Sequence, residues 1–228
     1  MEVLIGYKES EHIDIKTISV IGSFNDYDKS KGYMKKEGDI WYYKVNLDSG
    51  RHYYKFIIND QLIINDPEAN MYFPDKNEEL WSVVVINDND QRMYNNEEYS
   101  VNIDEYKLTN NISEEVKIAS KKSFSIIGDK KIVARFKFSN ITGLHVVTLA
   151  WFTPDNELFQ YSENNLFSKN RGDSKYLWFW LDLDNRNHKL KLGQWKIKLL
   201  IDGEFILEDD IKILNSNTYS AMGKINYL

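Results

Sequence analysis

Apolar and polar residues alternate with a period of two along several short stretches of this 228-residue chain. The alternation is clear at Ile18–Phe24, Trp41–Leu47, Tyr54–Ile58 and Ile132–Phe138. Because successive side chains of a strand point to opposite faces, this pattern predicts half-buried β-strands. Alanine, the best helix former, occurs only five times, whereas β-branched and aromatic residues are abundant. The chain is therefore expected to be all-β, with each apolar face covered by a second sheet.

Turn-forming residues separate these stretches and set the expected domain organisation. Asp48-Ser49-Gly50 separates two strand-like runs, and Asp202-Gly203 is a strong hairpin signal later in the chain. The polar stretch 87–98 is rich in Asn, Asp and Glu and is the best boundary, since a chain of this length is long enough for two domains. We expect two β-sandwich domains, at residues 1–95 and 100–228, the second of them immunoglobulin-like. A short helix is one interpretation of Ser113–Lys121, and the polar tail from Asn215 is expected to be loose.

Charge and composition exclude several classes of function. The formal net charge is −6, and lysine and arginine are interleaved with acidic residues, so no nucleic-acid partner is expected. No apolar run approaches the roughly 20 residues that a membrane helix needs, so no membrane partner is expected either. The first residues lack the pattern of a secretory signal, which makes the cytoplasm the expected location. The absence of cysteine excludes disulfides, thiolate metal sites and cysteine nucleophiles.

Known catalytic motifs are also missing. The sequence has no phosphate-binding glycine loop and no Gly-x-Ser-x-Gly elbow, and its four histidines are far apart. A pair of catalytic carboxylates cannot be recognised from sequence, because the two groups meet only in space. We expect no enzyme activity, no cofactor and no metal site.

The positive signal lies in the first third of the chain. Residues 20–28 read Val-Ile-Gly-Ser-Phe-Asn-Asp-Tyr-Asp, residues 50–60 read Gly-Arg-His-Tyr-Tyr-Lys-Phe-Ile-Ile-Asn-Asp, and residues 65–67 read Asn-Asp-Pro. This ordered set resembles carbohydrate-binding module family 48, which includes the glycogen-binding domain of the AMP-activated protein kinase β subunit. The resemblance implies an early-set immunoglobulin-like sandwich that holds α-1,4-linked glucose chains.

The same resemblance implies a set of sugar-binding residues. Binding members of the family use two tryptophans, a lysine and a loop before the last strand. The first tryptophan matches Tyr27, the lysine matches Lys55, and the second tryptophan matches Leu62, which is a departure from the family pattern. The loop falls near Asn77–Trp81.

Physical chemistry supports part of this assignment. A sugar ring laid against Tyr or Trp removes apolar area from water, and burying about 100 Å² contributes about 2.5 kcal/mol before entropy costs. Alternation in residues 53–58 places Lys55 opposite Tyr54 and Phe56, toward the surface, where its ammonium can donate to hydroxyls. Lys55 can equally be a solvated surface lysine, and Tyr27 can equally be a loop aromatic that packs on its own domain. Trp81 shares a strand face with other apolar residues, which favours a core role over a sugar-binding one.

Tryptophan is also frequent in the second half of the chain. Aromatic residues at period two in a sandwich are more often core than sugar platforms. We therefore expect a core role for all four tryptophans of this half: Trp151, Trp178, Trp180 and Trp195.

The functional hypothesis from sequence is non-catalytic binding of an α-1,4-glucan such as glycogen, through Tyr27, Lys55, Leu62, Asn77 and Trp81. The alternative is a scaffold protein whose first domain has lost sugar binding and contacts a protein partner. A glycan-active enzyme rests only on the company that such modules keep.

Overall fold

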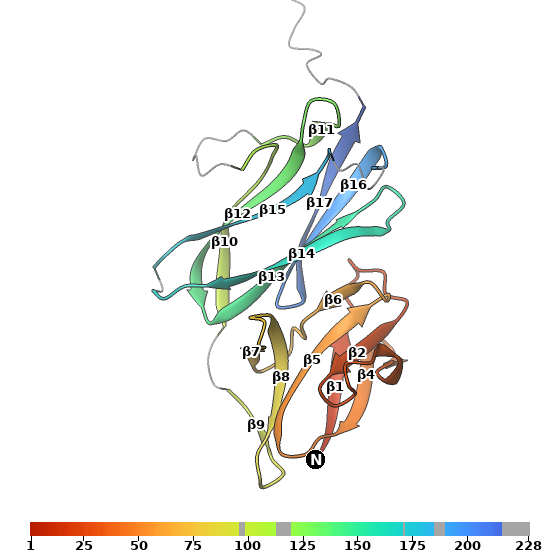
Figure 1. Cartoon of the computed structure of the whole chain (residues 1–228), viewed down its shortest axis with the longest axis vertical. Coiled ribbons are helices and arrows are strands. Elements are labelled where there is room, and N and C mark those ends of the chain that lie inside the picture. The colour runs from red at the N-terminus through yellow and green to blue at the C-terminus, as the bar shows by residue number, and fades with distance from the viewer. Residues whose placement is uncertain (96–98, 113–119, 171, 185–189, 216–228) are drawn as a thin grey trace, which may run out of the picture.

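The computed structural model describes residues 1–95, 99–112, 120–170, 172–184 and 190–215. Within these ranges the chain forms strands, with one 3₁₀ turn, η1 (Lys29–Lys31). Figure 1 shows two sandwiches stacked along the long axis, the N-terminal one in red to yellow and the C-terminal one in green to blue. The all-β fold expected from the alternating pattern is confirmed. The expected helix at Ser113–Lys121 and the expected loose tail lie almost wholly outside the described residues.

Two antiparallel sheets form the N-terminal sandwich. One sheet has the order β1-β4-β3, and the other has the order β2-β5-β8-β7, with β6 paired to β5 and β9 paired to β8. The bounds are β1 (Glu2–Lys8), β2 (Ile18–Gly22), β3 (Lys35–Glu37), β4 (Ile40–Asn46), β5 (Gly50–Ile58), β6 (Leu62–Ile64), β7 (Tyr72–Pro74), β8 (Leu80–Ile86) and β9 (Arg92–Met93).

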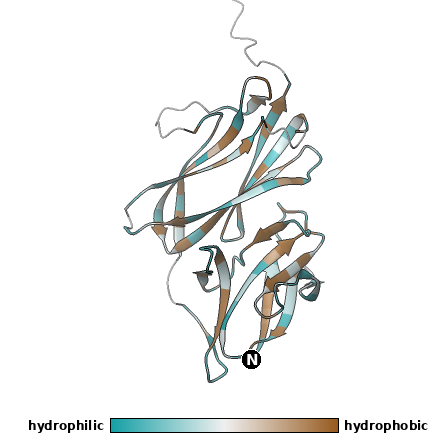
Figure 2. Ribbon diagram, viewed as in Figure 1, coloured by the Kyte–Doolittle hydropathy of each residue, from teal (hydrophilic) through white to brown (hydrophobic). Residues whose placement is uncertain are grey.

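The core of this sandwich follows the sequence period. Tyr54, Phe56 and Ile58 of β5 point inward and are almost completely buried. Tyr7 of β1 meets Phe56 edge to face, with ring centroids 5.4 Å apart. Figure 2 shows hydrophobic and hydrophilic residues mixed along many of the strands. The opposite face of β5 is therefore the one that can carry a site.

The C-terminal sandwich also consists of two sheets. One has the order β10-β12-β15, and the other has the order β11-β17-β16-β13-β14, in which β11 and β17 are parallel. The bounds are β10 (Ser100–Thr109), β11 (Ser123–Ser125), β12 (Lys131–Thr142), β13 (Leu144–Phe152), β14 (Leu158–Phe167), β15 (Lys175–Asp182), β16 (Gly193–Ile201) and β17 (Glu204–Leu214).

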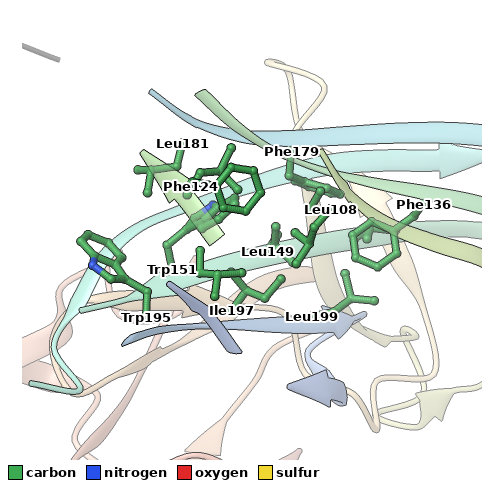
Figure 3. Close-up of a cluster of buried hydrophobic side chains, with 14 of the residues drawn as sticks. Leu108, Phe124, Phe136, Leu149, Trp151, Phe179, Leu181, Trp195, Ile197 and Leu199 are labelled. Atoms are coloured by element: carbon green, nitrogen blue, oxygen red, sulfur yellow. The ribbon is translucent and has the colours of Figure 1, made fainter. Parts of the chain in front are cut away.

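The core of the C-terminal sandwich is rich in aromatic side chains. Trp151 and Trp195 are fully buried there, among the cluster of apolar side chains drawn in Figure 3, as the sequence predicts. The expectation was wrong for Trp180, whose side chain is exposed, and Trp178 is only half-buried. The reason is strand phase: Phe179 takes the inward position on β15, so its two neighbours must face outward.

The two sandwiches share a continuous apolar contact. Ala150 of β13 and Leu200 of β16 are buried in the same cluster as the core of the N-terminal sandwich. The ring of His12 stacks on Phe205 with centroids 4.2 Å apart, and the Lys198 ammonium donates to the His12 carbonyl. One sheet of the C-terminal sandwich thus covers its own core with one face and contacts the N-terminal sandwich with the other.

Candidate functional site

A cleft of about 630 Å³ opens on the outer face of the β2-β5-β8-β7 sheet. Three of the five residues predicted from sequence, Tyr27, Asn77 and Trp81, lie in its wall. The complete lining is Tyr27, Tyr53, Pro74, Asp75, Lys76, Asn77, Glu79 and Trp81.

Tyr27 lies in the tight turn that follows β2. The buried side chain of Asn25 fixes this turn, because its Oδ1 accepts from the Gly22 N–H at 2.9 Å and its Nδ2 donates to the Val20 carbonyl at 2.9 Å. Tyr27 itself has a φ of 58°, a left-handed conformation that is uncommon outside glycine. The turn holds the phenol out from the sheet, and 49% of the residue is exposed. Burial and the nearby Asp75 carboxylate raise the pKa of the Tyr27 phenol, so the ring stays neutral.

Trp81 forms the other aromatic wall of the cleft. Its ring centroid lies 5.4 Å from that of Tyr27, with the ring planes at 76°. The sequence left open whether Trp81 is core, and the structure places it half-buried on the outer face of β8. Its indole N–H is buried and has no hydrogen-bond partner among the described residues. Two aromatic walls at right angles offer a sugar both a face and an edge to pack against.

The loop between β7 and β8 forms the polar rim. The Asp75 carboxylate accepts from the backbone N–H groups of Asn77 at 2.8 Å and Glu79 at 3.0 Å. Glu78 has a φ of 65°, and its carbonyl accepts from Nδ2 of Asn165 on β14 at 3.0 Å. The C-terminal sandwich therefore helps to hold this rim in place.

Lys55 corrects the sequence-based picture. It does face away from Tyr54 and Phe56, as alternation predicts, but the expectation of an exposed cation was wrong, since the residue is 0% exposed. Its Nζ lies 2.8 Å from Oε1 of Glu79 and 3.2 Å from Oε2 of Glu163, which belongs to β14 of the C-terminal sandwich. The ammonium also lies 5.2 Å from the centroid of the Trp81 ring. Lys55 is therefore placed behind the cleft wall and cannot itself touch a ligand in the cleft.

Leu62 lies away from the cleft. It pairs with Ile58 at the start of β6, is 4% exposed, and belongs to the core of the N-terminal sandwich. An apolar side chain at this position of the hairpin is more stable inside the core than on the surface. The structure therefore offers no aromatic platform at the position of the family's second tryptophan.

Sequence reasoning missed several residues of the site. Tyr53 could have been predicted from the sequence, because period two on β5 places it on the same face as Lys55. Glu79 follows Asn77 in the loop already singled out, but no pattern in the sequence marks its carboxylate as a partner of Lys55. Glu163 gave no signal at all, because its position depends on how the two sandwiches pack.

Comparison with known families bears on the N-terminal sandwich. Residues 11–92 match the glycogen recognition site of AMP-activated protein kinase. This match confirms the resemblance drawn from the Gly-Ser-Phe-Asn and Tyr-Tyr-Lys-Phe segments, and it spans β2, β5 and β8, which carry the cleft. It covers about a third of the chain and supports carbohydrate binding by the glycogen recognition module, while leaving the C-terminal sandwich unassigned.

Solved structures give only distant similarities. An alkylpurine DNA glycosylase from Pseudomonas fluorescens is 15% identical, with 50% of this chain and 30% of that chain covered and a TM-score of 0.34. A β-glucosidase from Listeria innocua is 13% identical, with 54% and 16% covered and a TM-score of 0.33. An immunoglobulin-like protein from Pseudomonas aeruginosa is 18% identical, with 50% and 97% covered and a TM-score of 0.35. The chain spans less than a third of the length of the first two proteins, and scores this low support no functional conclusion.

A search of curated proteins finds no match to the chain. No helix in the described ranges is long and apolar enough to cross a membrane. Among the same residues, no group of three or more His, Cys, Asp or Glu side chains is placed to hold a metal ion.

Proposed function

We propose that this protein binds an α-1,4-linked glucan, such as glycogen, in the cleft lined by Tyr27 and Trp81, and that it does so without catalysis. The observation that carries the proposal is the pair of aromatic rings, packed edge to face, on the outer sheet of a sandwich that matches a glycogen recognition module. The axial C–H groups of a glucose ring are apolar, so stacking on one wall removes apolar area from water.

The expected affinity is modest. One aromatic platform that buries about 100 Å² contributes about 2.5 kcal/mol, and the ordering of ligand and loop offsets part of that gain. The family's second platform is absent here, because Leu62 is in the core. We therefore expect dissociation constants in the millimolar range for short glucans.

A second candidate function is a protein-interaction module that has lost sugar binding. Two specific observations favour it: Lys55 is buried behind the cleft wall, and Leu62 has left the binding face. In this case the exposed rings of the cleft contact a protein side chain instead of a sugar.

Titration of the full chain with maltoheptaose, followed by calorimetry and by amide NMR shifts, separates the two candidates. Glucan binding predicts shifts that centre on Tyr27, Asn77 and Trp81 and saturate at millimolar ligand. Tyr27→Ala should weaken binding about tenfold through loss of one platform, and Tyr27→Phe should retain it, because the ring carries the contact.

The matched control for this experiment is Trp180→Ala, which removes an exposed tryptophan from the other sandwich. It should leave the affinity unchanged. Absence of any shift at millimolar maltoheptaose overturns the glucan proposal and leaves the protein-interaction hypothesis. Equal losses for Tyr27→Ala and Trp180→Ala would show that the site lies elsewhere.

A further inference from the structure

We propose that Glu79 is the polar anchor of the cleft, its carboxylate accepting hydrogen bonds from glucan hydroxyls, and that Glu163 of the C-terminal sandwich is a positioning residue acting on it through Lys55. The proposal rests on the proposed function and names which groups of that same site recognise the ligand. The sequence assigned hydrogen bonding to the sugar hydroxyls to the Lys55 ammonium, a donor. The proposal assigns it to the Glu79 carboxylate, an acceptor.

The geometry of Glu79 suits this role. The residue lines the cleft beside Trp81, and 46% of its side chain is exposed. Oε1 accepts from Lys55 at 2.8 Å, and Oε2 accepts no hydrogen bond from a described residue. A carboxylate has about four lone-pair sites, so Glu79 can hold Lys55 and still accept from a sugar hydroxyl. Hydrogen bonds to an ionised group are roughly twice as strong as those between neutral groups.

Lys55 is placed to fix both parts of the cleft wall. Its ammonium is completely buried, contacts the Glu79 carboxylate, and lies 5.2 Å from the Trp81 ring centroid. A side chain with three or more partners loses its rotamer freedom on folding, before the ligand arrives. Lys55 therefore preorganises the carboxylate and the ring relative to each other.

Glu163 holds Lys55 from the other side. Its Oε2 lies 3.2 Å from the Lys55 Nζ, and its Oε1 accepts from the Thr148 hydroxyl at 3.3 Å. Burial raises the pKa of the Glu163 carboxyl, and the nearby Lys55 ammonium opposes that effect without cancelling it. The other charged or titratable groups facing it are Glu79 on the rim and Tyr161 on its own strand. Since Glu163 is on β14, docking of the C-terminal sandwich and the polar geometry of the cleft are coupled.

The first test compares Glu79→Gln with Glu78→Gln in the full chain, using maltoheptaose and calorimetry. Both residues are in the same loop, but Glu78 does not line the cleft, and its contacts there come from its backbone: the carbonyl accepts from Asn165 and the N–H donates to the Asp75 carbonyl. Glu79→Gln should weaken binding about tenfold, because the acceptor loses its charge. Glu78→Gln should bind as the unmodified chain does. If the two variants bind equally well, the anchor assigned here is wrong.

The second test is a double-mutant cycle with Glu163→Gln. This near-isosteric change should weaken binding about threefold in the full chain, and it should have no further effect when Glu79 is already Gln, because the path runs through Glu79. Glu157→Gln is the control, since Glu157 is exposed and pairs with Lys191. Additive losses would contradict a positioning role, because a purely structural effect of Glu163 does not depend on Glu79.

The outcomes separate this proposal from the one on which it rests. If the unmodified chain does not bind maltoheptaose, glucan binding and the anchoring role of Glu79 are both overturned. If it binds and Tyr27→Ala weakens it while Glu79→Gln does not, glucan binding holds and the anchoring role alone is overturned.

Discussion

The Nζ of Lys55 lies 3.2 Å from Oε2 of Glu163, a residue 108 positions further along the chain and on the other sandwich. Through this contact β14 covers the outer face of β5 at Lys55. Burying a cation costs free energy unless carboxylates compensate it, and here Glu79 and Glu163 pair with the 0% exposed Lys55 from the two sandwiches. A single buried cation thus links the cleft rim to the apolar contact between the sandwiches.

Replacement of Lys55 by methionine should destabilise the protein by about 2–3 kcal/mol. The change leaves the Glu163 carboxylate without its cation, and the cost stays below that of a fully buried pair because Glu79 remains half exposed. Urea unfolding of the full chain measures the effect. The double variant Lys55→Met with Glu163→Leu should recover part of the loss, because no uncompensated carboxylate remains at Glu163. A single variant as stable as the unmodified chain would contradict this account.

Much of the fold could be predicted from the sequence, because strand period and turn chemistry are local. The alternating stretches Tyr54–Ile58 and Ile132–Phe138 lie within β5 and β12. The inward or outward phase of β15 was not predictable, because both of its faces carry aromatic residues. Its phase depends on which of the two faces meets the opposite sheet, a contact between distant segments.

The candidate site was predictable only in part. Tyr27 and Trp81 follow from the order of the motifs, and the direction of Lys55 follows from alternation on β5. The burial of Lys55 does not, because β14 covers it and nothing in the sequence near Glu163 encodes that packing. The burial of Leu62 was not predictable either, since a departure from the family pattern does not reveal that the side chain enters the core.

Asp66 should make the stability depend on pH. Burial raises the pKa of its carboxyl to about 6, although hydrogen bonds from the Tyr54 hydroxyl and the Glu68 N–H oppose this. The native state then binds its proton more tightly than the unfolded chain, so this stabilisation is lost as pH rises from about 4 to about 6. The unfolding free energy falls by about 3 kcal/mol in total over this range.

Urea unfolding at a series of pH values, carried out on the unmodified chain and on Asp66→Asn, checks this loss of unfolding free energy. The amide does not titrate, so the variant should lack the fall in unfolding free energy that the unmodified chain shows between pH about 4 and about 6. Parallel pH profiles for the two proteins would show that Asp66 titrates normally in the native state.

His145 should carry a positive charge at pH values where free histidine is mostly neutral. Its Nδ1 lies 2.6 Å from Oδ2 of Asp202 and its Nε2 lies 3.0 Å from the Thr142 carbonyl, so both nitrogens face acceptors. Burial lowers the pKa of the imidazole, but the hydrogen bond to Asp202 and its charge outweigh burial, and the net pKa is raised. The stabilisation is complete below about pH 6.5 and is lost as pH rises through the higher native pKa.

Nitrogen NMR of the His145 ring across a pH series provides the measurement, since the imidazolium and the neutral ring have distinct shifts. The midpoint of the titration should lie above that of a free histidine. Asp202→Asn removes the carboxylate charge and should shift the titration of His145 to lower pH. A neutral His145 ring in the unmodified chain at pH 6 would contradict the prediction.

Gly203 should tolerate no side chain, because of where the β16–β17 hairpin meets the N-terminal sandwich. A Cβ at Gly203 would lie 2.0 Å from the carbonyl oxygen of Asn65, and the residue has a φ of 91°. Gly38 has a similar backbone strain without the steric clash: its φ is 64°, but apart from its own chain neighbours no atom of the described residues lies within 4 Å of its Cβ position. Gly38→Ala should therefore cost about 1–2 kcal/mol from backbone strain alone.

Gly203→Ala should cost distinctly more than Gly38→Ala in urea unfolding, because the carbonyl of Asn65 is backbone and cannot move aside without shifting the contact between the sandwiches. The difference between the two variants then measures how firmly the sandwiches are held together at this hairpin. Equal losses of unfolding free energy would mean that the hairpin can shift at little cost. The contact between the sandwiches that covers Lys55 would then also be easily displaced.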